Sequence, residues 1–214
     1  MIPSANLDSN RYDFVFEKLR VLAPELPARL VFDVGAGDAR MRRIESLGLI
    51  WRGFDRQPWR DVARWNLTDP CPVEEKAGAV MLLDVIEHCV NPGMALMNVA
   101  AALKPNGRLI LTMPNPRWSA SRLHNLVFGI PSGFTKLDLV QNHHVFYPLP
   151  HVLEKLLNDA GLTVDEYVTL DGKSRLFRHR LSVARVLIEL IDKSACGMSF
   201  ALVARKTANS PPPA

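Results

Sequence analysis

Three polar positions that follow predicted strands have the spacing of a nucleotide-binding site. The stretch DVGAG at residues 33–37 ends an apolar run, and glycines there let the backbone turn sharply and approach a ligand closely. Asp55 follows Gly35 by twenty residues, where a carboxylate can accept hydrogen bonds from both hydroxyls of a ribose. Asn66 and Leu67 follow a third short strand, where a side-chain amide and a backbone N–H can meet the edge of a base. The spacing predicts a nucleoside pocket at one edge of a sheet.

A dinucleotide site is the main alternative at this glycine turn. Such a site needs a third glycine at position 40, so that a helix can pack closely beside the pyrophosphate. Arg40 occupies that position. The sequence therefore disfavours a nicotinamide-dependent oxidoreductase.

Three histidines are candidate catalytic bases, because imidazole accepts a proton readily near neutral pH. His88 follows Glu87 just past the fourth predicted strand, and His143 and His144 stand together later in the chain, close to Tyr147. Each has a plainer alternative. His88 can simply begin the next helix, and the histidine pair can belong to a surface turn.

The elements that must hold these residues alternate between strand and helix as far as residue 114, a pattern typical of an α/β, doubly wound parallel sheet. The segment 115–147 breaks the pattern, and a connection of that length predicts a lid or binding loop, with Asn115 and Tyr147 edging a substrate pocket. Strands are predicted at residues 30–34, 51–55, 62–67, 79–83, 108–113, 163–170 and 198–204, and helices at 13–22, 39–47, 91–103, 121–128, 149–160 and 174–194.

The length of 214 residues fits one domain, which we assign to residues 1–208 with a frayed, proline-rich tail at 209–214. The helix expected at 174–194 is basic and amphipathic. Its simplest interpretation is an apolar face packed on the sheet with a solvated basic face. The alternative is contact with an anionic membrane surface or an acidic partner.

Bulk composition excludes several classes of protein. A hydrophobic content of 48% with 22% charged residues is that of a globular chain, and no run is apolar enough to span a bilayer. A net charge of +4 is too weak to indicate nucleic-acid binding by itself. The three cysteines, Cys71, Cys89 and Cys196, are scattered and form no CxxC pair, so we expect a reduced, cytoplasmic protein without a disulfide framework or a metal site. Nothing in the sequence indicates an oligomeric state.

Five ordered stretches resemble the class I S-adenosylmethionine-dependent methyltransferases, in particular the subgroup of ubiquinone-biosynthesis O-methyltransferases and MetW-like proteins. They are VFDVGAGDAR (31–40), GFD (53–55), WNLTDPCP (65–72), LLDVIEH (82–88) and LKPNGRLILTMPN (103–115). The resemblance implies a Rossmann-like sheet of seven strands with the last strand antiparallel, and S-adenosylmethionine as cofactor. It also implies a cofactor site made by Asp33, Gly35, Ala36, Gly37, Asp55, Arg56, Asn66, Leu67, Asp84 and Val85.

Two positions depart from the family pattern. Ala39 replaces the third family glycine, and Asn66 replaces the usual adenine-contacting aspartate. The leading hypothesis is methyl transfer to a small-molecule acceptor such as a quinone precursor, a lipid or another metabolite. The second is a catalytically silent module that only binds the cofactor, which these departures and the lack of an obvious base would favour.

Overall fold

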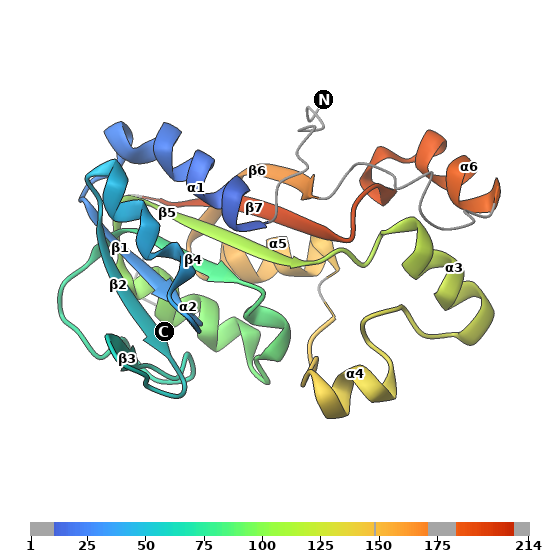
Figure 1. Cartoon of the computed structure of the whole chain (residues 1–214), viewed down its shortest axis with the longest axis horizontal. Helices are drawn as coiled ribbons and strands as arrows, with labels where there is room; N and C mark the ends of the chain where they lie inside the picture. Colours follow the sequence, from blue (N-terminus) through green and yellow to red (C-terminus); the bar gives the residue numbers. More distant parts are fainter. Residues whose placement is uncertain (1–10, 148, 171–182, 208–214) are drawn as a thin grey trace.

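The computed structural model describes residues 11–147, 149–170 and 183–207. Its centre is one seven-stranded sheet with the strand order β3-β2-β1-β4-β5-β7-β6 (Figure 1). The strands β1 to β5 pair in parallel, whereas β7 runs antiparallel to both of its neighbours. The predicted α/β fold with an antiparallel last strand is therefore confirmed. The strands are β1 (Leu30–Val34), β2 (Ile50–Asp55), β3 (Val62–Arg64), β4 (Ala77–Leu83), β5 (Leu103–Pro114), β6 (Leu162–Leu170) and β7 (Ser199–Lys206).

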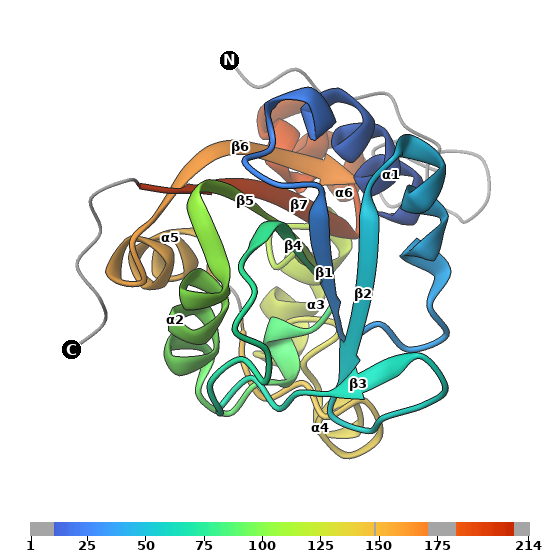
Figure 2. The ribbon, with the colours of Figure 1, turned by 90° about the vertical axis from the view of Figure 1, so that its left-hand side faces the viewer.

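Helices cover both faces of the sheet (Figure 2). One face packs against α1 and the 3-10 helix η2, and the opposite face packs against α2 and α5. Most predicted helices occur within a few residues of their expected bounds, except that residues 40–47 form a 3-10 helix and α4 is not predicted at all. The helices are α1 (Arg11–Leu22), η1 (Ala23–Glu25), η2 (Arg40–Leu47), η3 (Ile86–His88), α2 (Pro92–Ala102), α3 (Ser119–Phe128), α4 (Lys136–Gln141), α5 (Pro150–Asp159), α6 (Val183–Ile191) and η4 (Lys193–Ala195).

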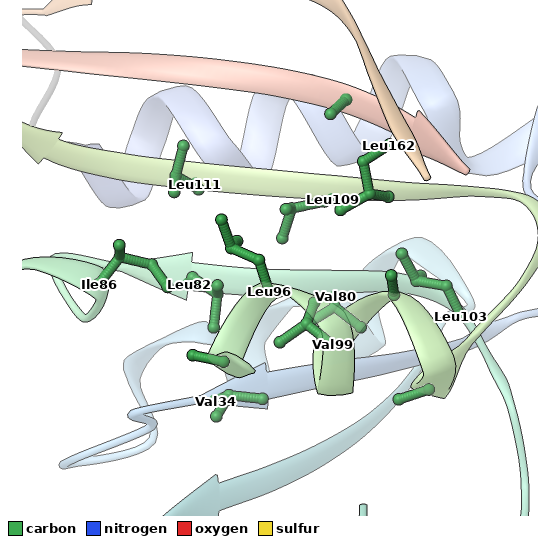
Figure 3. Close-up of a cluster of buried hydrophobic side chains, with 14 of the residues drawn as sticks. Val34, Val80, Leu82, Ile86, Leu96, Val99, Leu103, Leu109, Leu111 and Leu162 are labelled. Carbon is green, nitrogen blue, oxygen red and sulfur yellow. The ribbon is translucent and has the colours of Figure 1, made fainter. Parts of the chain in front are cut away.

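The central strands are mostly apolar because both faces of the sheet are covered there. All seven residues of β4 are buried, and alternate side chains enter opposite cores. Val80 and Leu82 face α2, where Leu96 and Val99 meet them (Figure 3). This packing fixes the positions of the strand ends that carry the predicted site.

The chain reverses direction across the sheet between β1 and β4. Strands β1, β2 and β3 proceed outward to one edge, and β4 then returns to pair with the free side of β1. In open α/β sheets, ligands bind beside the carboxyl ends of the strands at such a switch point. The predicted nucleoside residues belong to these strand ends.

The helix predicted at residues 174–194 belongs to the end of the molecule beyond the sheet, and its described part differs from the prediction. Helices α3, α4 and α6 all lie beyond the sheet at this end, with α3 between the other two (Figure 1), and α6 packs on α3. Residues 174–182 of the predicted basic helix lie outside the described residues. In the part that is described, Glu189 is buried and Arg185 is half-buried, whereas Leu187, Leu190 and Ile191 are exposed. The prediction of a solvated basic face is therefore wrong for residues 183–191, because their ionic side chains turn inward.

The ionic side chains of α6 turn inward because they form polar contacts with α3. The hydroxyl of Ser119 donates a hydrogen bond to the carboxylate of Glu189, and the Arg185 guanidinium lies 3.6 Å from the same carboxylate. Arg185 also stacks over the ring of Trp118 at 5.3 Å. None of the helices in the described ranges has both the length and the apolar character needed to cross a bilayer.

Candidate active site

A tight turn follows β1, and its backbone is left-handed at three positions. The φ angles are +75° at Gly35, +49° at Gly37 and +60° at Ala39. A Cβ atom on Gly35 would lie 2.5 Å from Cγ2 of Val85, so only glycine fits there. A Cβ atom on Gly37 would meet nothing closer than a carbonyl oxygen at 4.0 Å, which leaves open space in front of the turn. This open space is where the backbone can approach a ligand.

Asp55 reaches the glycine turn from the end of β2. Its Oδ2 accepts a hydrogen bond from the Gly37 N–H at 3.3 Å, and its Oδ1 accepts one from the Gln57 N–H at 3.1 Å. The side chain is only half-buried, so further lone pairs face outward. The structure thus brings together the carboxylate and the turn whose spacing predicted a ribose site, with Arg56 exposed beside them.

A small cavity opens in front of the turn, between it and the first helix. Its lining residues are Tyr12, Asp33, Gly35, Ala36, Gly37, Asp38, Arg40, Met41 and Leu83. One of these residues, Asp33, is buried, and the indole N–H of Trp51 donates a hydrogen bond to its carboxylate at 3.0 Å. Burial, together with the nearby charges of Asp55 and Asp38, raises the pKa of Asp33 to about 6.

The predicted adenine residues lie beside the end of β2. The Trp65 N–H donates to the Asp55 carbonyl at 2.9 Å, which holds the following Asn66 and Leu67 near the ribose position. Leu67 is buried, and its carbonyl accepts a hydrogen bond from the Asn98 amide at 2.9 Å. Asn66 Oδ1 accepts a long hydrogen bond of 3.4 Å from the Thr68 N–H.

Asp84 stands at the end of β4 in the left-handed region, with a φ angle of +56°. The Thr112 hydroxyl donates to one of its carboxylate oxygens at 2.7 Å, and Arg11 forms an ion pair with the other at 2.8 Å. The next residue, Val85, is the one that contacts Gly35. Asp84 therefore presents a fixed negative charge at the switch point.

A second polar cluster lies directly after Asp84. Glu87 is fully buried, and neither of its carboxylate oxygens has a hydrogen-bond partner in another described residue. Burial and the charge of Asp84 raise the pKa of Glu87 to about 8. The His88 and His144 rings lie 5.0 Å apart, and the His144 Nδ1 lies 2.6 Å from the Gly133 carbonyl. Desolvation and the charge of His144 lower the pKa of His88.

The other residues predicted for catalysis or for the substrate pocket, His143, Tyr147 and Asn115, have different surroundings. His143 is exposed and does not join the cluster of Glu87, His88 and His144. The Tyr147 hydroxyl donates to the Pro116 carbonyl at 3.3 Å, so Tyr147 ties the two ends of the 115–147 segment together. Asn115, predicted to edge a substrate pocket, is instead 3% exposed, and its amide donates to the backbone carbonyls of Ser194 and Gly197, each at 3.0 Å. Its contacts are structural.

Comparison with known protein families identifies the family to which this chain belongs. A family model described as a methyltransferase domain matches residues 8–167, well over half of the chain. The chain belongs to this methyltransferase family. Membership and fold together confirm the enzyme class predicted from the sequence and its cofactor, S-adenosylmethionine. No curated protein matches the chain.

Solved structures share the fold of the methyltransferase at low sequence identity. A SAM-dependent methyltransferase from Archaeoglobus fulgidus is 18% identical with a TM-score of 0.62, over 91% of this chain and 94% of that one. The CcbJ methyltransferase from Streptomyces caelestis is 14% identical with a TM-score of 0.59, over 93% and 97%. The [4+2]-cyclase SpnF is 16% identical with a TM-score of 0.55, over 90% and 82%. Because a cyclase has the same fold, the acceptor and its chemistry must be argued from the site.

Sequence reasoning missed three residues at the site of this methyltransferase. Arg11 and Tyr12 come from α1, whose periodicity predicts a helix but not which loop it covers. Glu87 lies next to a predicted residue, and its burial follows from the return of the chain at residues 145–146. There the N–H groups of Val145 and Phe146 donate to the Glu87 carbonyl at 2.9 and 3.0 Å. No local pattern in the sequence signals that contact.

Proposed function

We propose that the methyltransferase moves a methyl group from S-adenosylmethionine to a small-molecule acceptor held between β4 and the 115–147 segment, which acts as a lid. The observation that carries the proposal is the bond between the Asp55 carboxylate and the Gly37 N–H, with open space in front of the turn. Asp55 and the turn form a cradle for a ribose and for the chain attached to it. The residues that bind the cofactor are Asp33, Gly35, Ala36, Gly37, Asp55, Arg56, Asn66, Leu67, Asp84 and Val85.

The residues present fit the charge distribution of this cofactor. The left-handed glycine turn supplies close backbone approach, Asp55 supplies acceptors for two hydroxyls, and Asp84 supplies a negative charge near a cationic sulfur. When bound, the cofactor supplies an electrophilic methyl group on that sulfur. The protein must align the acceptor with it and promote the loss of the acceptor's proton.

His88 and His144 are the groups proposed to promote that proton loss. His88 comes four residues after Asp84, and His144 is brought to it by the lid. Tyr147, which packs at 4.8 Å on Phe134, forms the wall of the acceptor pocket. His143 has no such position and retains no role.

Cofactor binding is tested by calorimetry with S-adenosylmethionine and its demethylated product. Removal of a charged acceptor of hydrogen bonds costs about 1.5–3 kcal/mol, so the Asp55→Ala variant should bind at least about tenfold more weakly. The Asp61→Ala variant, which removes an exposed carboxylate nearby, is the matched control and should bind normally. Absence of binding by the unaltered protein would sink the proposal.

The acceptor is identified by mass spectrometry. The protein is incubated with a metabolite extract and cofactor carrying a deuterated methyl group, and a small molecule should gain the labelled methyl. Label found only on protein or RNA would overturn the small-molecule assignment.

The three cysteines are unpaired, which supports the proposed cytoplasmic location.

We also infer that the end of the molecule formed by α3, α4 and α6 contacts an anionic membrane surface, which suits a lipid-like acceptor. Among the residues that the structure describes, eleven of nineteen exposed large hydrophobic residues belong to these helices or to Ile130, which follows α3. They are Leu126, Val127, Phe128, Ile130, Leu137, Leu139, Val140, Val183, Leu187, Leu190 and Ile191. Exposed apolar side chains concentrated at one end of a molecule are typical of an interaction surface.

The charge of the sequence that precedes α6 favours a membrane over a neutral partner. The sequence 171–182, which leads directly into α6, contains four cations (Lys173, Arg175, Arg178 and Arg180) against one acid, Asp171. Basic residues that directly precede an amphipathic helix in the sequence favour an anionic lipid surface, where each contributes about 1 kcal/mol.

Sedimentation with vesicles tests this contact. The protein should bind vesicles of phosphatidylglycerol and phosphatidylcholine but not phosphatidylcholine alone. A double Leu187→Ser, Leu190→Ser variant should bind at least about tenfold more weakly, since a buried leucine contributes about 1.5–3 kcal/mol. Val21→Ser, which replaces an exposed side chain of α1, is the control. Dimers that form without any vesicle binding would overturn the membrane assignment.

A further inference from the structure

The Glu87 carboxylate is a buried acid that no described residue satisfies. The residue is 0% exposed, and both oxygens lack a hydrogen-bond partner in another described residue. Arg11, whose positive charge lowers the pKa of Glu87 against the larger effect of burial, is already paired with Asp84. Leaving a carboxylate buried without a partner costs several kcal/mol, so a missing cation or proton must offset that cost. An unsatisfied buried group of this kind calls for an explanation such as a bound ion.

Two imidazoles supply the remaining ligands of a metal site. One ligand atom each from Glu87, His88 and His144 lies within 4.8 Å of the other two. The Nδ1 of His144 lies 2.6 Å from the Gly133 carbonyl, which fixes a proton on Nδ1 and leaves the lone pair on Nε2. Backbone carbonyls that orient imidazoles in this way are the usual outer shell of metal-binding histidines.

The cluster is held together across 57 residues of chain by main-chain contacts. The N–H groups of Val145 and Phe146 both donate to the Glu87 carbonyl, so the residue after His144 is fixed against η3. Ligands of a tetrahedral zinc ion lie about 3.3 Å apart when each is about 2.0 Å from the metal. The three ligand atoms need to approach one another by at most about 1.5 Å, which rotation of the side chains can supply.

We propose that Glu87, His88 and His144 bind a divalent transition-metal ion, zinc above all, and leave one coordination position open toward the acceptor. Two histidines and one carboxylate with an open position are a ligand set of catalytic zinc sites. The proposal replaces the expectation from the cysteines that the chain has no metal site. Metal binding stands by itself, and only its role in catalysis rests on the proposed function.

In that role the acceptor is a molecule that offers a hydroxyl oxygen to the open position. A bound divalent ion lowers the pKa of a coordinated hydroxyl, so its proton leaves to water. The oxygen then forms the bond to the methyl carbon, while the carbon–sulfur bond breaks and its electron pair goes to sulfur. The histidines thus promote proton loss as ligands and do not take up the proton themselves.

Zinc binding to the chelator-treated, full-length protein tests the site. Calorimetry should give one zinc per chain, and cobalt added in place of zinc should give the visible absorption of a four-coordinate ion. The Glu87→Gln and His144→Ala variants should each bind zinc at least about tenfold more weakly. The His143→Asn variant is the matched control, because this neighbouring histidine lies outside the cluster and asparagine tolerates its φ angle of +56°.

The outcomes separate this site from the proposed function. Circular dichroism and cofactor calorimetry are recorded on the same samples, so that loss of zinc in a folded, cofactor-binding variant counts in favour of the site. If one zinc binds but His143→Asn weakens it as much as His144→Ala, surface binding explains the result and the proposal is overturned. No zinc binding by unaltered protein that still binds cofactor also overturns it, without affecting the proposed function.

Discussion

Replacing Gly35 by alanine should lower the free energy of unfolding by more than backbone strain alone would. The left-handed φ angle of +75° costs an alanine about 1–2 kcal/mol. The new Cβ would also lie 2.5 Å from Cγ2 of Val85, and overpacking of this kind typically costs about 1–3 kcal/mol. We therefore expect Gly35→Ala to lower the free energy of unfolding by about 3 kcal/mol.

A double-mutant cycle separates the two contributions. Val85→Ala removes the clashing methyl group, so Gly35→Ala in that background should cost only the strain of about 1–2 kcal/mol. The difference, a coupling of about 1–2 kcal/mol, is measured by urea denaturation of the four proteins in chelator. Equal costs of Gly35→Ala in both backgrounds would refute the contact between the turn and Val85 as the reason for this glycine.

Three further predictions concern stability. The pKa of Asp33 is raised to about 6 in the folded state, so the stabilisation that its protonation provides is complete below about pH 4 and is lost as the pH rises through 6. Unfolding measured at pH 5 and 7 should show the unaltered protein losing about 1 kcal/mol more than Asp33→Asn, and parallel profiles would contradict this. Ala39→Gly should raise the free energy of unfolding by about 1 kcal/mol, because glycine adopts the φ angle of +60° without strain; a lower midpoint in thermal unfolding would count against it. Asn115→Ala should lower the free energy of unfolding by about 2–4 kcal/mol, since it leaves two backbone carbonyls without a donor, and a urea midpoint unchanged by the substitution would exclude that account.

The sheet could be predicted because its strands are apolar on both faces and alternate with helices. The pairing of Asp55 with the glycine turn could be predicted for the same reason. The strands β1 and β2 are parallel neighbours, so residues that end them must meet. The predicted third strand, by contrast, is shorter than expected: β3 ends at Arg64 because Trp65 turns into the core beside Phe54.

The cluster around Glu87 could not be predicted, because it depends on the path of a long connection. His88 and His144 are far apart in sequence, and their meeting follows from two main-chain hydrogen bonds that carry no signature in residue types. The inversion of α6 escaped prediction for a different reason. Periodicity reveals that a helix has two faces but not which of them meets the protein, and here Glu189 finds its partners on α3.

The position of β7 between β5 and β6 has a consequence for synthesis of the chain. Strands β5 and β6 do not pair with each other, and β7, which follows both in the sequence, joins them. While the chain emerges from the ribosome, the edge of β5 that pairs with β7 has unpaired backbone N–H and C=O groups until residues 199–206 are synthesised. Open strand edges of this kind recruit other chains, so nascent chains that stall before residue 199 should be the species most prone to aggregate.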